Sequence, residues 1–293
     1  MSDRWQSALA VPARSELEAR LRQLTSGQMP IDRIAEAALL MAGLDRPGKA
    51  MVHYLDHLEE LARDTAAAAA DLGANRTDIW TPDLRLEALR GVFAVRHGYC
   101  GDHESYDDPQ NANLMSVIER RRGLPVSLGI LTLQVARAQG WHMNGVSFPG
   151  HFLISMDTGG ARVIIDPFNG WRQLAASDIR ELLKAITGLG AELSPAHYAA
   201  VDDRHVLLRL QNNVKLRAVQ AGRLSDGLAS LEIMLMIAPD SAELWREAAL
   251  LHINTDNLRA AIPALERFIK LAPSDPRADE AFALIRDLRH RLN

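Results

Sequence analysis

Apolar residues recur at helical spacing through the first hundred positions of this chain. Isoleucine, alanine, leucine and methionine return every three or four residues, as expected of helices that bury one face. Ser15 and Glu18 have the spacing of a capping box, which predicts a helix start at Ser15. Thr81 followed by Pro82 has the pattern of an N-cap and a first-turn proline. The predicted helices run from residue 15 onward, over 31–44 and 47–70, and from 82 to about 95.

The pattern changes after residue 96. Residues 96–111 are polar and rich in glycine, aspartate and histidine, which indicates a loop. Short apolar runs then predict three strands, and Thr158-Gly159-Gly160 between the last two is a hairpin signal. We therefore expect a small antiparallel sheet beside short helices. The predicted helices cover 114–121 and 125–139, and the predicted strands cover 144–148, 152–156 and 162–165.

The C-terminal part of the chain carries a repeat. Leu235-Met-Ile-Ala-Pro239 and Ile269-Lys-Leu-Ala-Pro273 lie 34 residues apart. Helix pairs with this period and a proline just after the second helix are typical of tetratricopeptide repeats. Because such repeats stack, we expect about two of them between flanking helices, with an unrelated helical bundle as the alternative. Helices are predicted over 207–220, 225–237, 242–252 and 257–271.

These patterns define a fold class. Only 5% of the residues are aromatic, and alanine and leucine abound, which favours helices over a large sheet. We expect an α+β protein that is mostly helical, with a first domain over 1–195 and an all-α repeat domain over 202–293. A linker is expected near residues 194–202.

Composition and charge exclude several functional classes. A hydrophobic content of 47% and a charged content of 24% are those of a soluble globular protein. The net charge of −4, with no basic block, argues against nucleic acid as a partner. The N-terminal segment lacks a signal-peptide pattern and no apolar run is long enough to span a membrane, so we expect no membrane contact. The single cysteine, Cys100, fits a reducing compartment, and the predicted location is cytoplasmic.

His151 and Asp166 are the first candidates for chemistry. His151 stands at the entry of a predicted strand and Asp166 closes the next one, before Pro167. A carboxylate there could accept the imidazole Nδ1 proton, fix the tautomer and stabilise the imidazolium that activates a nucleophile. The structural alternatives are a histidine that only packs and an aspartate that caps a turn. Asn169, Trp171 and Trp141 are expected to line the same region or simply to pack there.

The same stretch resembles a known family. Its motifs are Tyr106-Asp-Asp-Pro-Gln-Asn-Ala-Asn-Leu114, Arg122-Gly-Leu-Pro-Val-Ser-Leu128, Phe148-Pro-Gly-His-Phe-Leu153 and Ile165-Asp-Pro-Phe168, in this order. Together they resemble the transglutaminase-like superfamily, and more closely its bacterial branch named after the invasion regulator B protein, which has C-terminal tetratricopeptide repeats. The resemblance covers about residues 30–190. It implies a papain-like core, in which a cysteine opens a helix and a histidine and an aspartate lie on the following strands, and a regulatory association in bacteria.

The chain departs from the enzymes of that family at the nucleophile. Matching His151 and Asp166 to the catalytic pair puts Pro125 where the resemblance implies cysteine, and proline offers no nucleophile. Ser127 is one candidate substitute, although bonding to the helix backbone is its ordinary role and its hydroxyl would depend on His151. Cys100 is the other, provided that its loop folds over the pair; its histidine neighbours could then activate the thiol.

Metal ligation is a further alternative. The spacing His97-x-x-Cys100-x-x-His103 could bind zinc, with a fourth ligand still to be identified. His53 and His57 share a helix face but lack the glutamate of a metalloprotease motif, so we expect them on a polar face. No phosphate-binding loop is present, and no cofactor is expected.

The run Arg120-Arg121-Arg122 concentrates positive charge at a predicted helix end. A solvated helix end favoured by the helix dipole is one interpretation, and a support for aspartate or carbonyl groups near the core is another. Contact with a polyanion is a third and weaker one.

The leading hypothesis is a non-catalytic transglutaminase-like protein whose repeat region binds a protein partner, as an interaction module or regulatory adaptor. His151 and Asp166 would then bond a polar group of that partner. The alternative is a hydrolase or acyl transferase that acts through Ser127 or Cys100 with His151. The partner itself is not identified by the sequence.

Overall fold

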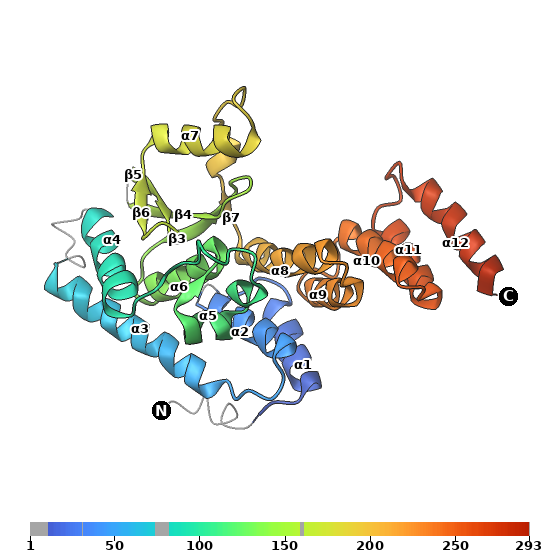
Figure 1. The fold of residues 1–293 in the computed structure, drawn as a ribbon, viewed down its shortest axis with the longest axis horizontal. Coiled ribbons are helices and arrows are strands. Elements are labelled where there is room, and N and C mark those ends of the chain that lie inside the picture. Colours follow the sequence, from blue (N-terminus) through green and yellow to red (C-terminus); the bar gives the residue numbers. More distant parts are fainter. Residues whose placement is uncertain (1–10, 31, 74–81, 159–160, 293) are drawn as a thin grey trace. The chain divides into compact units, whose positions relative to one another are not determined.

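The computed structural model describes residues 11–30, 32–73, 82–158 and 161–292 (Figure 1). It divides into two compact units, Met1–Leu207 and Leu208–Asn293. The division falls inside helix α8 (Asp203–Gln220). The predicted class is confirmed, because the first unit combines helices with a small antiparallel sheet and the second is all helical.

Helices dominate the first unit, as the apolar spacing predicted. Two predicted starts are wrong: α1 begins at Arg14 rather than Ser15, and α3 begins at Val52 rather than Pro47. No side chain caps α1; Arg14 instead pairs with Glu18 at 2.9 Å, one turn on. Ile31 and Thr81 lie outside the described residues. The helices are α1 (Arg14–Thr25), α2 (Ile34–Asp45), α3 (Val52–Asp71), α4 (Pro82–Arg90) continued by the π-helical η2 (Gly91–Arg96), α5 (Leu114–Arg120), α6 (Pro125–Ala138) and α7 (Ala176–Thr187).

Helix α2 lies at the centre of this unit and is buried around its whole circumference. An almost continuous apolar sequence allows that, since a helix without a polar face is stable only inside a core. The exception is Glu36, which is 3% exposed and pairs with Arg20 at 2.7 Å and with Arg33. A buried carboxylate requires such partners, and the Arg20 pair joins α1 to α2.

The sheet has the strand order β6-β5-β4-β3-β7, with every neighbouring pair antiparallel. Its strands are β3 (Met143–Val146), β4 (Leu153–Thr158), β5 (Ala161–Asp166), β6 (Arg172–Leu174) and β7 (Ala200–Val201). The predicted β4–β5 hairpin is present, although its turn residues 159–160 lie outside the described part. Strands β6 and β7 and helix α7 were not predicted.

Helices α6 and α7 cover opposite faces of the sheet (Figure 1). On the α6 side, a Cβ on Gly129 would lie 2.3 Å from Cε1 of Phe152, so glycine allows the helix to approach β4 closely. On the α7 side, Ile179 and Leu183 pack on the strand residues Leu153 and Ile164. The start of α6 is therefore held against the strand that follows His151.

Residues 96–111 are not the plain loop that was predicted. They contain β1 (Cys100–Gly101) and most of the 3-10 helix η3 (Pro109–Ala112), and β1 pairs in parallel with β2 (Arg122–Gly123). Arg120 holds this region together: its guanidinium donates to Asp102 at 2.9 Å and to the side-chain oxygen of Asn111 at 3.0 Å. Of the three adjacent arginines, this one has the supporting role.

The second unit has the predicted repeat. Leu231 and Leu265, 34 residues apart, are both buried. Ala238 and Ala272 end their helices with nearly the same backbone angles, φ −134°, ψ 71° and φ −135°, ψ 65°. The helices are the C-terminal part of α8, α9 (Leu224–Ile237), α10 (Ala242–Asn254), α11 (Leu258–Leu271) and α12 (Ala278–Leu292), of which only α12 was not predicted.

Candidate functional site

His151 and Asp166 lie side by side. Asp166 is the last residue of β5, while His151 stands in a bend before β4 rather than on the strand. The pairing of Ile154 with Ile165 brings the end of one strand next to the beginning of the other. Nε2 of His151 is 3.1 Å from Oδ1 of Asp166, so the ring presents Nε2 and not the expected Nδ1. The N–H direction is poor for a hydrogen bond, which leaves a close polar contact.

Asp166 also caps a turn, which is the structural alternative predicted for it. Its carboxylate accepts hydrogen bonds from the backbone N–H of Phe168 at 3.0 Å and from the side-chain amide of Asn169 at 2.6 Å. Burial by itself raises the pKa of Asp166, but the contacts with His151 and Asn169 outweigh it and hold that pKa below its ordinary value. The carboxylate is therefore a fixed negative charge at neutral pH.

This lowered pKa predicts an acid-side loss of stability. Asp166 stabilises the fold above its unfolded pKa of about 4, and that contribution is lost as the pH falls through the lower folded value. We expect Asp166→Asn to be less stable at pH 7 by about 1–2 kcal/mol and to lose less stability than the wild type between pH 7 and pH 3. Thermal unfolding midpoints at the two pH values measure this. Asp157→Asn, in an exposed pair, is the control, and an unchanged acid loss in Asp166→Asn would contradict the assignment.

Aromatic rings surround the pair on one side. Phe168 packs against His103, with ring centroids 4.4 Å apart, and against Tyr106 and His151 at 5.7 Å and 6.1 Å. A Cβ on Gly101 would lie 2.5 Å from the carbonyl oxygen of Phe168. Strand β1 therefore touches the turn that carries Asp166, and His103 belongs to this site rather than to a metal site.

The candidate nucleophiles are placed differently. Pro125 is the buried first residue of α6, as its sequence position predicted. Ser127 is fully buried and its Oγ donates to the backbone carbonyl of Asn111 at 2.7 Å. Cys100 is exposed on β1. Within the described residues, the polar and ring contacts of His151 are to Asp166 and Phe168, and neither candidate makes such a contact.

The tryptophans near the pair have packing roles. Trp171 is fully buried, stacks on Phe93 at 5.0 Å and donates from Nε1 to Oγ1 of Thr132 at 2.8 Å. Trp141 lies at the other end of α6, at a separate pocket. Of the three residues expected beside the pair, Asn169 is the one that bonds Asp166.

The structure does not bring His97, Cys100 and His103 together as metal ligands. Nε2 of His97 instead contacts Asp64 on α3 at 2.7 Å. In the described part of the chain, the group with metal-ligand geometry is His57, Glu60 and His97, whose ligand atoms lie within 4.8 Å of one another.

His57 is buried and not on the polar face that was predicted. Its Nδ1 contacts Glu60 at 2.8 Å and its Nε2 contacts the hydroxyl of Tyr99 at 3.0 Å. The Arg121 guanidinium also touches this ring, and a divalent cation would be repelled by that charge. The spacing of His57 and Glu60, three residues apart on a helix, was the only sequence signal of this cluster.

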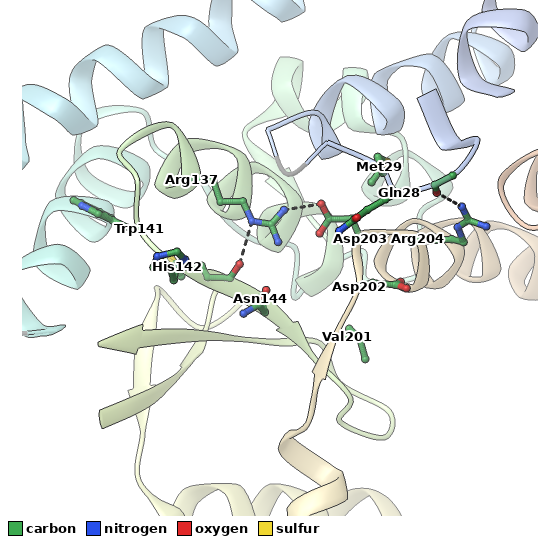
Figure 2. Close-up of a pocket in the computed structure, with 12 residues that line it drawn as sticks. Gln28, Met29, Arg137, Trp141, His142, Asn144, Val201, Asp202, Asp203 and Arg204 are labelled. Carbon is green, nitrogen blue, oxygen red and sulfur yellow. Dashed lines mark hydrogen bonds and ion pairs between the residues drawn. The ribbon is translucent and has the colours of Figure 1, made fainter. Parts of the chain in front are cut away.

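A separate pocket of about 630 Å³ lies where the end of α6 meets β3 and the start of α8 (Figure 2). At its centre, Arg137 donates to Asp203 at 2.6 Å and to the carbonyl of Met143 at 3.0 Å. Arg204 donates to the carbonyls of Thr25 and Gly27 at 2.7 Å and 2.8 Å. Sequence reasoning missed this pocket, because its walls come from segments that are far apart along the chain.

None of the described helices is long and apolar enough to cross a membrane.

A model of the transglutaminase-like superfamily matches residues 50–212, and a tetratricopeptide repeat model matches residues 214–286. These matches confirm the resemblance inferred from the sequence motifs.

Several bacterial proteins are similar to this chain. A UPF0162 protein of Xylella fastidiosa (strain Temecula1) is 32% identical over 206 residues, covering 67% of this chain and 71% of that protein. A UPF0162 protein of Vibrio cholerae is 31% identical over 70% of this chain and 76% of its own length. Protein SirB1 of Salmonella typhimurium is 23% identical over 86% of this chain and 90% of its own length.

Among solved structures, a crystal structure of menin matches with a TM-score of 0.39 and 10% identity, over 94% of this chain and 70% of that chain. This likeness is too distant to inform the fold.

The family model covers more than half of the 293 residues, and the Xylella relative is similar over two thirds of them. The chain therefore belongs to the transglutaminase-like superfamily and carries tetratricopeptide repeats in its C-terminal unit.

Proposed function

We propose that this chain is a non-catalytic transglutaminase-like protein that acts as a cytoplasmic adaptor and binds a protein partner through its repeats. The observation that carries the proposal is that His151 and Asp166 keep their contact of 3.1 Å while α6 opens with Pro125. An imidazole next to a carboxylate can still accept or donate a hydrogen bond. Acyl transfer through a covalent intermediate requires a nucleophile that this helix start does not offer.

The two substitute nucleophiles fit this proposal. The Ser127 hydroxyl is buried and donates to the Asn111 carbonyl, which also accepts the backbone N–H of Leu124 at 3.1 Å. That bond supports the start of α6, a structural role. Cys100 is solvent-exposed and its side chain makes no bond to a histidine in the part of the chain that the structure describes.

The repeat unit offers a surface for a partner. Leu216 on α8 and Leu250 on α10 lie 34 residues apart, at equivalent positions of successive repeats. Their exposed fractions are 46% and 39%, although leucine in a stacked repeat is usually buried. Exposed apolar residues at the repeat period favour recognition of an extended or helical segment of another protein.

Labelling of Cys100 and Ser127 tests the non-catalytic part of the proposal. We expect iodoacetamide to alkylate Cys100 at the rate of an ordinary exposed thiol, with the same rate in a His151→Ala variant. A fluorophosphonate probe should leave Ser127 unlabelled. Cys100→Ser, which removes the only thiol, is the control for the alkylation site. Stoichiometric labelling of Ser127, or alkylation of Cys100 that depends on His151, would establish the enzyme alternative instead.

Affinity capture from the native bacterium, with the full-length tagged chain as bait, tests the adaptor part. We expect a specific protein to be retained by the wild type and lost from a Leu216→Glu, Leu250→Glu double variant. Leu189→Glu is the matched control, since Leu189 is 88% exposed but lies outside the repeats. If the double variant retains the same proteins as the wild type and the Leu189→Glu control, the repeat surface is not the partner site.

A further inference from the structure

Arg121 has a backbone conformation that is unusual for arginine. It ends α5 with φ 59° and ψ 20°, in the left-handed region, and its N–H bonds the Val117 carbonyl. Glycine is the residue that takes this helix-end position without strain, whereas a Cβ costs about 1 kcal/mol. The backbone role therefore does not require arginine, which points to a role for its side chain.

The guanidinium of Arg121 contacts Tyr99 and His57, and the Glu60 carboxylate bonds the other nitrogen of the His57 ring at 2.8 Å. The guanidinium donates to the Tyr99 hydroxyl at 2.6 Å, lies over the Tyr99 ring at 4.9 Å and contacts Nε2 of His57. Burial, followed by the Arg121 charge, lowers the pKa of His57, and burial raises the pKa of Tyr99 to about 12. Both partners are thus uncharged at neutral pH.

The neighbouring arginines differ in this respect. Arg120 pairs with Asp102, Arg122 with Glu104 and Arg46 with Glu119. Among the described residues, no carboxylate lies within 4 Å of the Arg121 guanidinium. A half-buried cation without a counter-ion is a charge that a bound anion would stabilise.

A cavity of about 630 Å³ opens beside this guanidinium. Lys49, His53, Tyr54 and His57 line it together with Arg121 and Glu119. Glu119 is already neutralised, because it pairs with Arg46 at 2.9 Å and accepts the Tyr54 hydroxyl at 2.6 Å. Among the described lining residues, Arg121 and Lys49 are therefore the free cations and Glu119, the one carboxylate, is engaged elsewhere.

We propose that this cavity binds a small oxyanion, a phosphate or carboxylate group of a ligand, on the Arg121 guanidinium. Nη1 of Arg121 is engaged with Tyr99 and His57, while no described residue bonds its Nε and Nη2 groups, which can bind an oxyanion as a fork. Lys49 adds a second cation on the cavity wall. The site is separate from His151 and Asp166 and does not depend on the adaptor function.

Phosphate titration of the full-length chain tests the site. His57 reports on it, because an anion on Arg121 offsets the charge that helps to lower the His57 pKa. Glu60 and His97 also face the His57 ring, but neither lines the cavity. We expect inorganic phosphate at constant ionic strength to raise the pKa of His57, read from its imidazole C2–H signal in NMR. A second titration with acetate shows whether the site prefers carboxylate or phosphate. The His57 pKa in chloride is the reference for both titrations.

Arg121→Gly removes the guanidinium while supplying the residue that the backbone favours. We expect this variant to stay folded and to bind phosphate at least about tenfold more weakly, as loss of a charge-assisted hydrogen-bonded pair implies. Arg122→Gln, which removes an adjacent exposed charge, should bind like the wild type. Lys49→Gln, on the cavity wall, should weaken phosphate binding several-fold. It tests the same site if Arg121→Gly does not fold. No response of His57 to either anion in the wild type, or unchanged affinity in the Arg121→Gly and Lys49→Gln variants, would overturn the proposal.

Discussion

Gly101→Ala is expected to destabilise the first unit by about 3 kcal/mol, the upper range for overpacking a tight contact. The added Cβ would lie 2.5 Å from the backbone oxygen of Phe168 and 2.6 Å from a carbon of its ring. A flexible side chain could move away, but a backbone carbonyl cannot move without its turn. That turn also carries Asp166, so the His151–Asp166 contact should be disturbed together with stability.

Thermal unfolding and the NMR signal of His151 check this prediction. A loss of this size corresponds to a drop of roughly 6–12 °C in the unfolding midpoint for a unit of this length. Gly91→Ala is the matched control, because a Cβ there meets no atom within 4 Å and alanine suits a helix. If Gly101→Ala melts like the wild type, the contact between β1 and the Asp166 turn is not as tight as the geometry indicates.

Arg137→Ala is expected to cost about 3–5 kcal/mol, the penalty for leaving a buried charge without its partner. The side chains of Arg137 and Asp203 are only 7% and 9% exposed and lie 2.6 Å apart at the centre of the pocket in Figure 2. Arg137 also bonds the Met143 carbonyl, so its removal leaves a strand carbonyl and a helix-start carboxylate without this donor.

A double variant separates the buried charge from the fold itself. Arg137→Met with Asp203→Leu removes both charges at similar volume and should be more stable than Arg137→Ala by about 2 kcal/mol, because buried ion pairs are often replaceable by apolar residues. Arg162→Ala is the surface control; its pair with Asp157 is about 40% exposed and should contribute at most about 1 kcal/mol. Chemical denaturation of the wild type, the two Arg137 variants and Arg162→Ala measures the differences in free energy of unfolding. Equal losses in the single and double variants would show that packing, not charge, dominates at Arg137.

Local patterns predicted the parts of the fold that depend on neighbouring residues. The period of 34 residues located the repeats, because stacking demands the same buried positions in each unit, such as Leu231 and Leu265. Pro125 correctly predicted the start of α6, since proline suits a first helical turn. The capping box at Ser15 did not form: Glu18 pairs with Arg14 instead of bonding back to the helix start, and α1 begins one residue earlier.

Contacts between distant segments were beyond those patterns. His57 and Tyr99 are 42 residues apart, and Arg137 and Asp203 are 66 residues apart. No periodicity links such positions. Strands β1 and β2 have two residues each, too short to carry an alternating pattern, and pair across 22 positions of the chain.

By itself the sequence determined the family, the helical repeats and the nearness of His151 to Asp166, because each depends on residue order and local spacing. Only the tertiary structure decided which nitrogen of His151 faces the carboxylate, that Ser127 bonds a backbone carbonyl, and that Arg121 lies beside a cavity. Those outcomes depend on side-chain direction and on which charges share a low-dielectric interior, and both are set by packing between segments far apart in the chain.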